Sequence, residues 1–171
     1  MAKSGESIVK KYLENKSIQV VKIPETSVKT VDFAVYYSGD LFFYLEEKTI
    51  ELAPLAWKNV DPIYNAIGKH IYEAAKQFQS INPGREVPNV LSFTNMDPAR
   101  SIDDLFTTLT GHVITSRGKL QRIEVMKKLE QRLSMIDLFL WFDQDKLVGH
   151  IGDENNTQFE EILIDVLDLE Y

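Results

Sequence analysis

The stretch from Lys29 to Ile50, KTVDFAVYYSGDLFFYLEEKTI, constrains the fold more than any other segment of the chain. Two apolar, strand-forming runs, 31–37 and 41–50, flank a Ser-Gly-Asp sequence that is typical of a hairpin turn. Apolar side chains occupy both alternating sets of positions in the second run, which predicts a strand covered on both faces. Among the charged residues that interrupt this pattern away from the turn are Asp32, Glu46 and Lys48.

The other periodic segments place helices and strands around this hairpin. A helix is predicted over residues 4–17 with Ser4 as its N-cap, and a long helix from Pro62 to Ser80, where apolar residues recur every three or four positions. Further helices are predicted at residues 97–111, 120–133 and 156–171, with Ser101 capping the first of these, and further strands at 18–23, 89–95 and 136–142. This order predicts an α/β fold, with a mixed central sheet flanked by helices in a single domain over residues 1–171.

Composition narrows the class of protein. The chain has 171 residues, 44% of them hydrophobic, and no cysteine, so disulfides and thiolate metal sites are excluded. No apolar run approaches the length needed to cross a bilayer, and we expect a soluble cytoplasmic protein without membrane contacts. The net charge of −7 comes from the acidic segment after Ile136, which leaves room for a locally basic groove elsewhere.

The register of the hairpin decides whether its charged residues meet. A three-residue loop at 38–40 would pair Tyr37 with Leu41 and bring Asp32 opposite Glu46, on the face that Lys48 shares. A two-residue turn at 39–40 would instead bring Asp32 opposite Glu47. We expect the three-residue loop, because it gathers Asp32, Glu46 and Lys48 into one cluster.

Such a cluster has a definite chemistry. Two carboxylates about 5 Å apart repel each other in a poorly solvated site, and a divalent cation relieves the repulsion. Mg²⁺ takes oxygen ligands, commonly one or two carboxylates with waters and phosphate oxygens. A lysine beside the metal can assist a water or stabilise negative charge, as phosphodiester hydrolysis requires.

With KTVDF followed by EEK, with an early GE in the first helix and with a long helix after the second motif, the chain resembles the PD-(D/E)XK nuclease superfamily. The resemblance implies a restriction-endonuclease-like three-layer α/β/α fold, in which residues 1–95 form the nuclease-like core and 96–171 an α/β extension ending in an acidic helix. It implies that Asp32 and Glu46 bind Mg²⁺ or Mn²⁺ with the main-chain carbonyl of Glu47, and that Lys48 assists the attacking water. Glu6 and Gln77 resemble auxiliary site residues of some members, and Val31 stands where proline is common.

Plainer interpretations stay open. Asp32, Glu46 and Lys48 could form an exposed salt bridge at the strand ends, and Glu6 could stabilise the first turn of its helix. Lys69, Glu73 and Lys76 have the spacing of ordinary helix-surface pairs.

The leading hypothesis is a metal-dependent nuclease acting on nucleic acid, expected to be DNA. The alternative is a catalytically inactive binding or assembly module on the same fold, and homodimerisation through the C-terminal strand and helix would suit either. A small-molecule enzyme is a third hypothesis, for which the sequence offers no motif.

Overall fold

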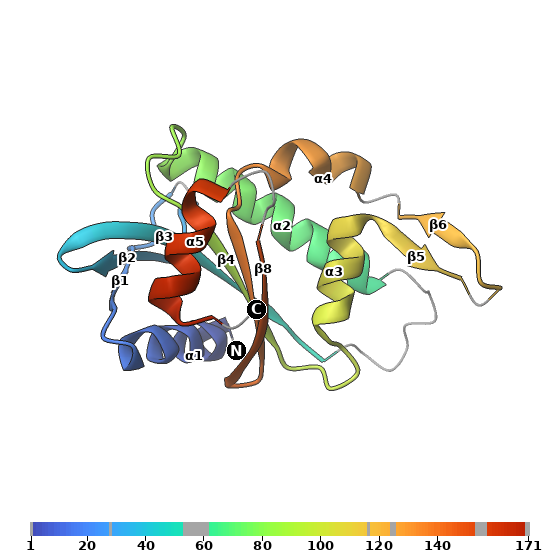
Figure 1. The fold of residues 1–171 in the computed structure, drawn as a ribbon, viewed down its shortest axis with the longest axis horizontal. Coiled ribbons are helices and arrows are strands. Elements are labelled where there is room, and N and C mark those ends of the chain that lie inside the picture. The colour runs from blue at the N-terminus through green and yellow to red at the C-terminus, as the bar shows by residue number, and fades with distance from the viewer. Residues whose placement is uncertain are drawn as a thin grey trace.

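A computed structural model describes residues 2–27, 29–52, 62–115, 117–123, 126–152 and 157–169. It shows an α/β protein with a six-stranded mixed sheet in the order β1-β2-β3-β4-β7-β8, against which several helices pack (Figure 1). The hairpin and the first edge pair are antiparallel, whereas β3, β4 and β7 run parallel to one another. β3 therefore lies inside the sheet, as its apolar faces predicted.

The elements follow one another along the chain in a mixed order of helices and strands. The strands are β1 (Gln19–Lys22), β2 (Phe33–Tyr37), β3 (Asp40–Ile50), β4 (Asn89–Asn95), β5 (His112–Ile114), β6 (Leu120–Arg122), β7 (Leu138–Asp143) and β8 (Lys146–Gly152). The helices are α1 (Ala2–Asn15), α2 (Pro62–Ile81), α3 (Ile102–Thr110), α4 (Met126–Leu133) and α5 (Thr157–Leu167). None of the helices in the described ranges has the length and apolar content that a membrane crossing requires.

Two hydrophobic cores lie on the two faces of the sheet. α2, α3 and α4 bury apolar side chains in one core, with Phe93 and Trp141 from the sheet. α1 and α5 contribute to the other core, with Phe43 and Phe142. The alternation of side chains along β4 and β7 supplies both cores from the same strands.

Several predicted boundaries were wrong. Residues 120–133 are not one helix: 120–122 form β6, which pairs with β5 in a small hairpin, and α4 begins only at Met126. The edge strand β8 was missed, because its two glycines weaken the alternating pattern that predicts a strand. Pairing with β7 stabilises the strand in spite of this low propensity. Ser4 is not a cap, since α1 already begins at Ala2, whereas Ser101 does cap α3.

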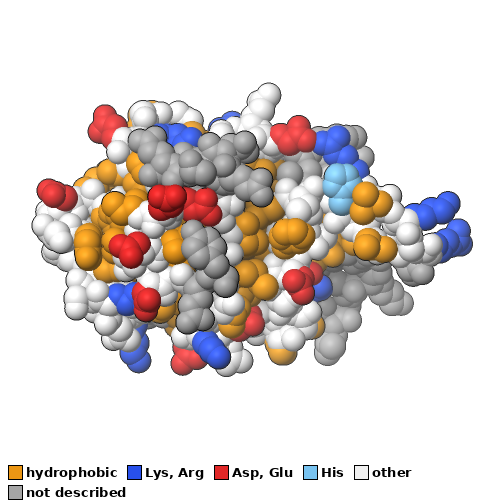
Figure 2. Space-filling view, viewed as in Figure 1, with side chains coloured by type: hydrophobic (Ala, Val, Ile, Leu, Met, Phe, Trp, Pro, Cys, Tyr) orange, Lys and Arg blue, Asp and Glu red, His pale blue; other side chains and the backbone are white. Residues whose placement is uncertain are grey.

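Figure 2 shows basic side chains at the tip of the protruding β5–β6 hairpin, far from the scattered acidic groups near α5.

The β2–β3 hairpin has the expected register for an unexpected reason. Its turn consists of Ser38 and Gly39, both with positive φ, so Tyr37 pairs with Asp40 and neither predicted loop is present. A β-bulge at Phe42 then shifts the pairing by one residue, so that Phe33 lies opposite Leu45. Continued by one residue, this register brings Asp32 level with Glu46, as the sequence predicted.

Candidate active site

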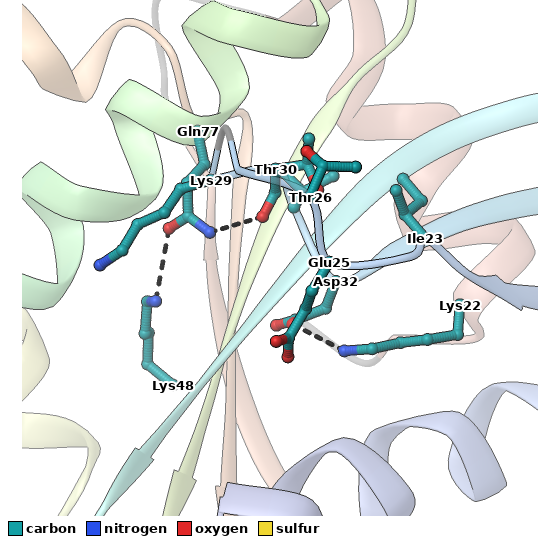
Figure 3. A pocket seen from close by; sticks show the side chains of 10 residues that line it. Lys22, Ile23, Glu25, Thr26, Lys29, Thr30, Asp32, Lys48 and Gln77 are labelled. Atoms are coloured by element: carbon teal, nitrogen blue, oxygen red, sulfur yellow. Dashed lines mark hydrogen bonds and ion pairs between the residues drawn. The ribbon is translucent and has the colours of Figure 1, made fainter.

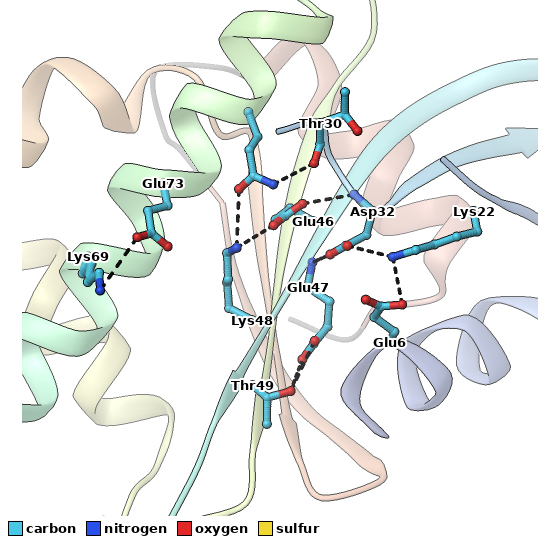
Figure 4. Close-up of polar contacts among 11 residues, drawn as sticks. Glu6, Lys22, Thr30, Asp32, Glu46, Glu47, Lys48, Thr49, Lys69 and Glu73 are labelled. Atoms are coloured by element: carbon cyan, nitrogen blue, oxygen red, sulfur yellow. Dashed lines mark hydrogen bonds and ion pairs between the residues drawn. The ribbon is translucent and has the colours of Figure 1, made fainter. Parts of the chain in front are cut away.

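Charged and polar side chains from α1, α2, β3 and the residue before β2 meet at the start of β2 (Figure 4). Asp32 directly precedes β2, and Glu46 and Lys48 lie two residues apart in the second half of β3. Glu6 comes from α1 and Gln77 from α2, on the two sides of the sheet. All five predicted catalytic side chains therefore lie in this one region.

Glu46 is the buried centre of this cluster, with only 1% of its surface exposed. Its Oε1 accepts a hydrogen bond from Lys48 Nζ at 2.6 Å, and its Oε2 accepts one from the main-chain N–H of Asp32 at 3.0 Å. Burial, and then the negative charge of Asp32, raise the pKa of Glu46 to about 7, although Lys48 opposes the shift. A carboxyl with this pKa is only partly ionised near neutral pH.

The carboxylate of Asp32 is held from two sides. Its Oδ2 accepts a hydrogen bond from the main-chain N–H of Glu47 at 2.9 Å, and its Oδ1 accepts one from Lys22 Nζ, also at 2.9 Å. Lys22 also contacts Glu6 Oε2 at 2.8 Å, so it bridges the acid of α1 to Asp32. Burial alone would lower the pKa of Lys22, but the hydrogen bonds and charges of Glu6 and Asp32 raise it overall.

Lys22 is the site residue that the sequence interpretation missed. It occupies the last position of β1, and β1 pairs antiparallel with β2 so that Lys22 lies opposite Phe33, next to Asp32. The only signal in the sequence was a lysine closing a short strand, which is a common pattern at strand ends. Its significance follows from the pairing of β1 with β2.

Gln77 connects α2 to the cluster. Its side-chain N–H donates to the carbonyl of Thr30 at 2.7 Å, which fixes the orientation of the amide. The opposite end of the amide, Oε1, then accepts from Lys48 Nζ at 3.4 Å. Lys48 is therefore directed by both Glu46 and Gln77, and its side chain remains 17% exposed.

Glu47 faces the other side of the sheet, toward α1. Its side chain is 6% exposed and accepts a hydrogen bond from the Thr49 hydroxyl at 3.0 Å. Burial raises its pKa to about 7, against the opposing effect of the Thr94 and Thr49 hydroxyls. Gly5 of α1 lies directly over it, because a Cβ there would come within 2.2 Å of Glu47 Oε1. The close approach of α1 at this glycine brings the neighbouring Glu6 to Lys22.

The donor set fits a hard divalent cation held by few protein groups. Each carboxylate oxygen of Asp32 and Glu46 accepts one hydrogen bond and retains a second lone pair. The main-chain N–H of Glu47 points to Asp32. In a β-strand the C=O of a residue points to the same side as its N–H, so the carbonyl oxygen of Glu47 also faces Asp32. No group of three or more acidic or histidine side chains is arranged for a metal within the described ranges. A cation here would therefore rely on two carboxylates, one carbonyl and water or substrate oxygens, as Mg²⁺ commonly does.

A cavity of about 410 Å³ opens beside these residues (Figure 3). Lys22, Asp32, Lys48 and Gln77 line it, together with Lys29 and other residues of the segment that connects β1 to β2. Lys48 can thus reach a bound molecule, whereas Glu46 lies behind it. The cavity is of the size that small ligands or part of a polymer occupy.

The plainer interpretations fare differently. An exposed strand-end salt bridge is wrong for Glu46 and Lys48, because both are largely buried. The first-turn interpretation of Glu6 is wrong, because α1 already begins at Ala2, and the Glu6 carboxylate contacts Lys22 at the site. Lys69 and Glu73 do form an exposed helix pair, at 3.9 Å.

Comparisons of the chain with protein-family models, curated proteins and solved structures found no match.

Proposed function

We propose that this protein is a metal-dependent nuclease of the PD-(D/E)XK type, with a restriction-endonuclease-like fold, that hydrolyses phosphodiester bonds in nucleic acid, expected to be DNA. The observation that carries the proposal is the contact of Lys48 Nζ with the buried carboxylate of Glu46, beside Asp32 and at the wall of an open cavity. Two neighbouring carboxylates beside a lysine that a bound molecule can reach are the groups that a cation-dependent hydrolytic site needs.

Each residue has a distinct part in this proposal. Asp32, Glu46 and the Glu47 carbonyl would hold Mg²⁺ or Mn²⁺, which supplies Lewis acidity and a water of lowered pKa. Lys48 orients the attacking water from the cavity side and offsets the charge that develops on the phosphate. Gln77 keeps Lys48 directed at that position through its anchor on Thr30. Lys22, which also contacts Glu6, pairs with Asp32 from the α1 side and partly neutralises its charge.

One observation favours the alternative of a non-catalytic binding or assembly module. Every oxygen of Asp32 and Glu46 already accepts a hydrogen bond from the protein, so the cluster is satisfied as a structural network. In that case the lysines would occupy the place of the cation permanently. The two functions differ in whether a divalent cation binds with dependence on both acids.

Cleavage assays separate the two functions. Purified protein is incubated with plasmid and short duplexes in Mg²⁺ or Mn²⁺, beside Lys48→Ala and the exposed control Lys146→Ala. We expect Lys48→Ala to lose about 100-fold or more in rate and the control to keep it. Thermal unfolding of each variant shows whether the fold is retained. Calorimetry with Mn²⁺ completes the test by measuring whether the cation binds with dependence on Asp32 and Glu46. If the protein neither cleaves nucleic acid nor binds Mn²⁺ in this way, the binding or assembly module is the function that is supported.

A further inference from the structure

A second hollow, of about 560 Å³, adjoins the cavity at the site. The two share Lys29 and Gln77 in their walls, so they lie side by side; together they are named here the depression. The second hollow runs along the outer face of α2, from Ser80 back to Lys69, and is named here the α2 groove. At 1.5 Å per residue, this face extends for about 16 Å.

Cations predominate in the walls of this depression. Five lysines line the two hollows, against three acids, although the whole chain carries a net charge of −7. The acids are Glu25, Asp32 and Glu73 and the lysines are Lys22, Lys29, Lys48, Lys69 and Lys76. Asp32 is paired with Lys22, Glu46 with Lys48 and Glu73 with Lys69. The lysines outside these pairs are Lys29 and Lys76, and both line the α2 groove.

Tyr72 strengthens the positive character of the groove. Lys76 Nζ lies 5.4 Å and the Arg132 guanidinium 5.2 Å from the centre of its ring, so both cations lie against this one aromatic side chain. Two cations held on one ring repel each other, and an anion between or beside them lowers that cost. Tyr72 is 37% exposed, which leaves this group open to a ligand.

We propose that the α2 groove binds the sugar-phosphate backbone of a nucleic acid whose adjoining phosphodiester enters the cavity beside Lys48. The choice of nucleic acid as the occupant rests on the function proposed above. Lys69 and Lys76 contact successive phosphates along α2, and Lys29 contacts the backbone at the junction of the two hollows. The amide of Gln77 is engaged by Thr30 and Lys48, so it is not available to read base edges. Because the contacts of the three lysines are to phosphates, we expect binding in the groove to be independent of base sequence.

The test measures binding without cleavage. Fluorescence anisotropy of a labelled 20-base-pair duplex in EDTA gives the affinity at several salt concentrations for the full chain. Lys69→Ala/Lys76→Ala removes two lysines of the groove, and Lys11→Ala/Lys146→Ala removes two exposed lysines from α1 and β8. Because the net charge changes equally, a difference between the double variants reports the place of the lysines.

We expect the groove variant to lose about 10- to 100-fold in affinity near 0.1 M salt, and its log–log salt slope to fall by about two. The control variant should retain the affinity of the parent, and duplexes of different sequence should bind within about twofold of each other. Equal behaviour of the two variants, no duplex binding by the parent, or a strong sequence preference would overturn the proposal. Binding is measured in EDTA, where no cleavage occurs, so it is independent of the cleavage assay in Mg²⁺ or Mn²⁺. If the protein binds duplex through the groove but does not cleave it with either cation, the nuclease proposal is refuted and the groove proposal is retained.

Discussion

Replacing Glu47 by glutamine should stabilise the metal-free protein at pH 8 and change it much less at pH 5. The carboxyl is 6% exposed, and its pKa rises from 4.5 to about 7, chiefly through burial. The folded state therefore retains a proton that the unfolded chain loses between these two values. The stability that this proton confers is complete below pH 4.5 and is lost as the pH rises through about 7.

The size of the effect follows from the shift. With 1.36 kcal/mol for each pKa unit, the ionised carboxylate reduces the free energy of unfolding by about 3 kcal/mol at pH 8 and by less than about 1 kcal/mol at pH 5. Glutamine has nearly the same shape, carries no charge at either pH, and keeps an oxygen to accept from the Thr49 hydroxyl. The gain should therefore be about 2.5 kcal/mol larger at pH 8 than at pH 5.

Urea unfolding in EDTA, followed by circular dichroism at both pH values, measures this difference. Glu51→Gln is the matched control, since it removes an exposed carboxylate just beyond the end of β3. Some pH dependence should remain in the Glu47 variant, because the pKa of Glu46 is also raised to about 7. An equal effect of Glu47→Gln at the two pH values, or a loss of stability at pH 8, would refute the reasoning.

Two further substitutions test the contacts that hold the site. Gly5→Ala should cost about 2 kcal/mol in thermal or urea unfolding, because its Cβ would overlap Glu47 Oε1, whereas Gly84→Ala meets no side chain closer than 3.7 Å. Equal tolerance of both changes would contradict the close approach of α1. Lys22→Ala should tighten Mn²⁺ binding about fivefold in calorimetry, since it removes a cation that partly neutralises Asp32 through an exposed ion pair of about 1 kcal/mol. Unchanged or weaker binding would show that Lys22 is needed to position that carboxylate.

Local pattern was sufficient where neighbours along the chain decide the outcome. The buried stripe of α2, which includes Ile67, Ile71 and Phe78, was predicted because a helix repeats every 3.6 residues whatever packs on it. Glu46 and Lys48 were placed on one face because side chains of a strand alternate. The interior position of β3 followed from its two apolar faces, and the capping of α3 by Ser101 followed from local hydrogen bonding.

The sequence by itself determined the α/β class, the strand-and-helix order around the hairpin and the acids and lysine that could share a face. Only the tertiary structure decided that a bulge at Phe42 sets their register, that Lys22 joins them, and that α1 rests on Glu47 at Gly5. The physical reason is that these contacts join residues distant in the chain, whose meeting depends on strand pairing and helix packing. Burial, too, is a property of the assembled fold, so the raised pKa of Glu46 could not be read from its neighbours in the sequence.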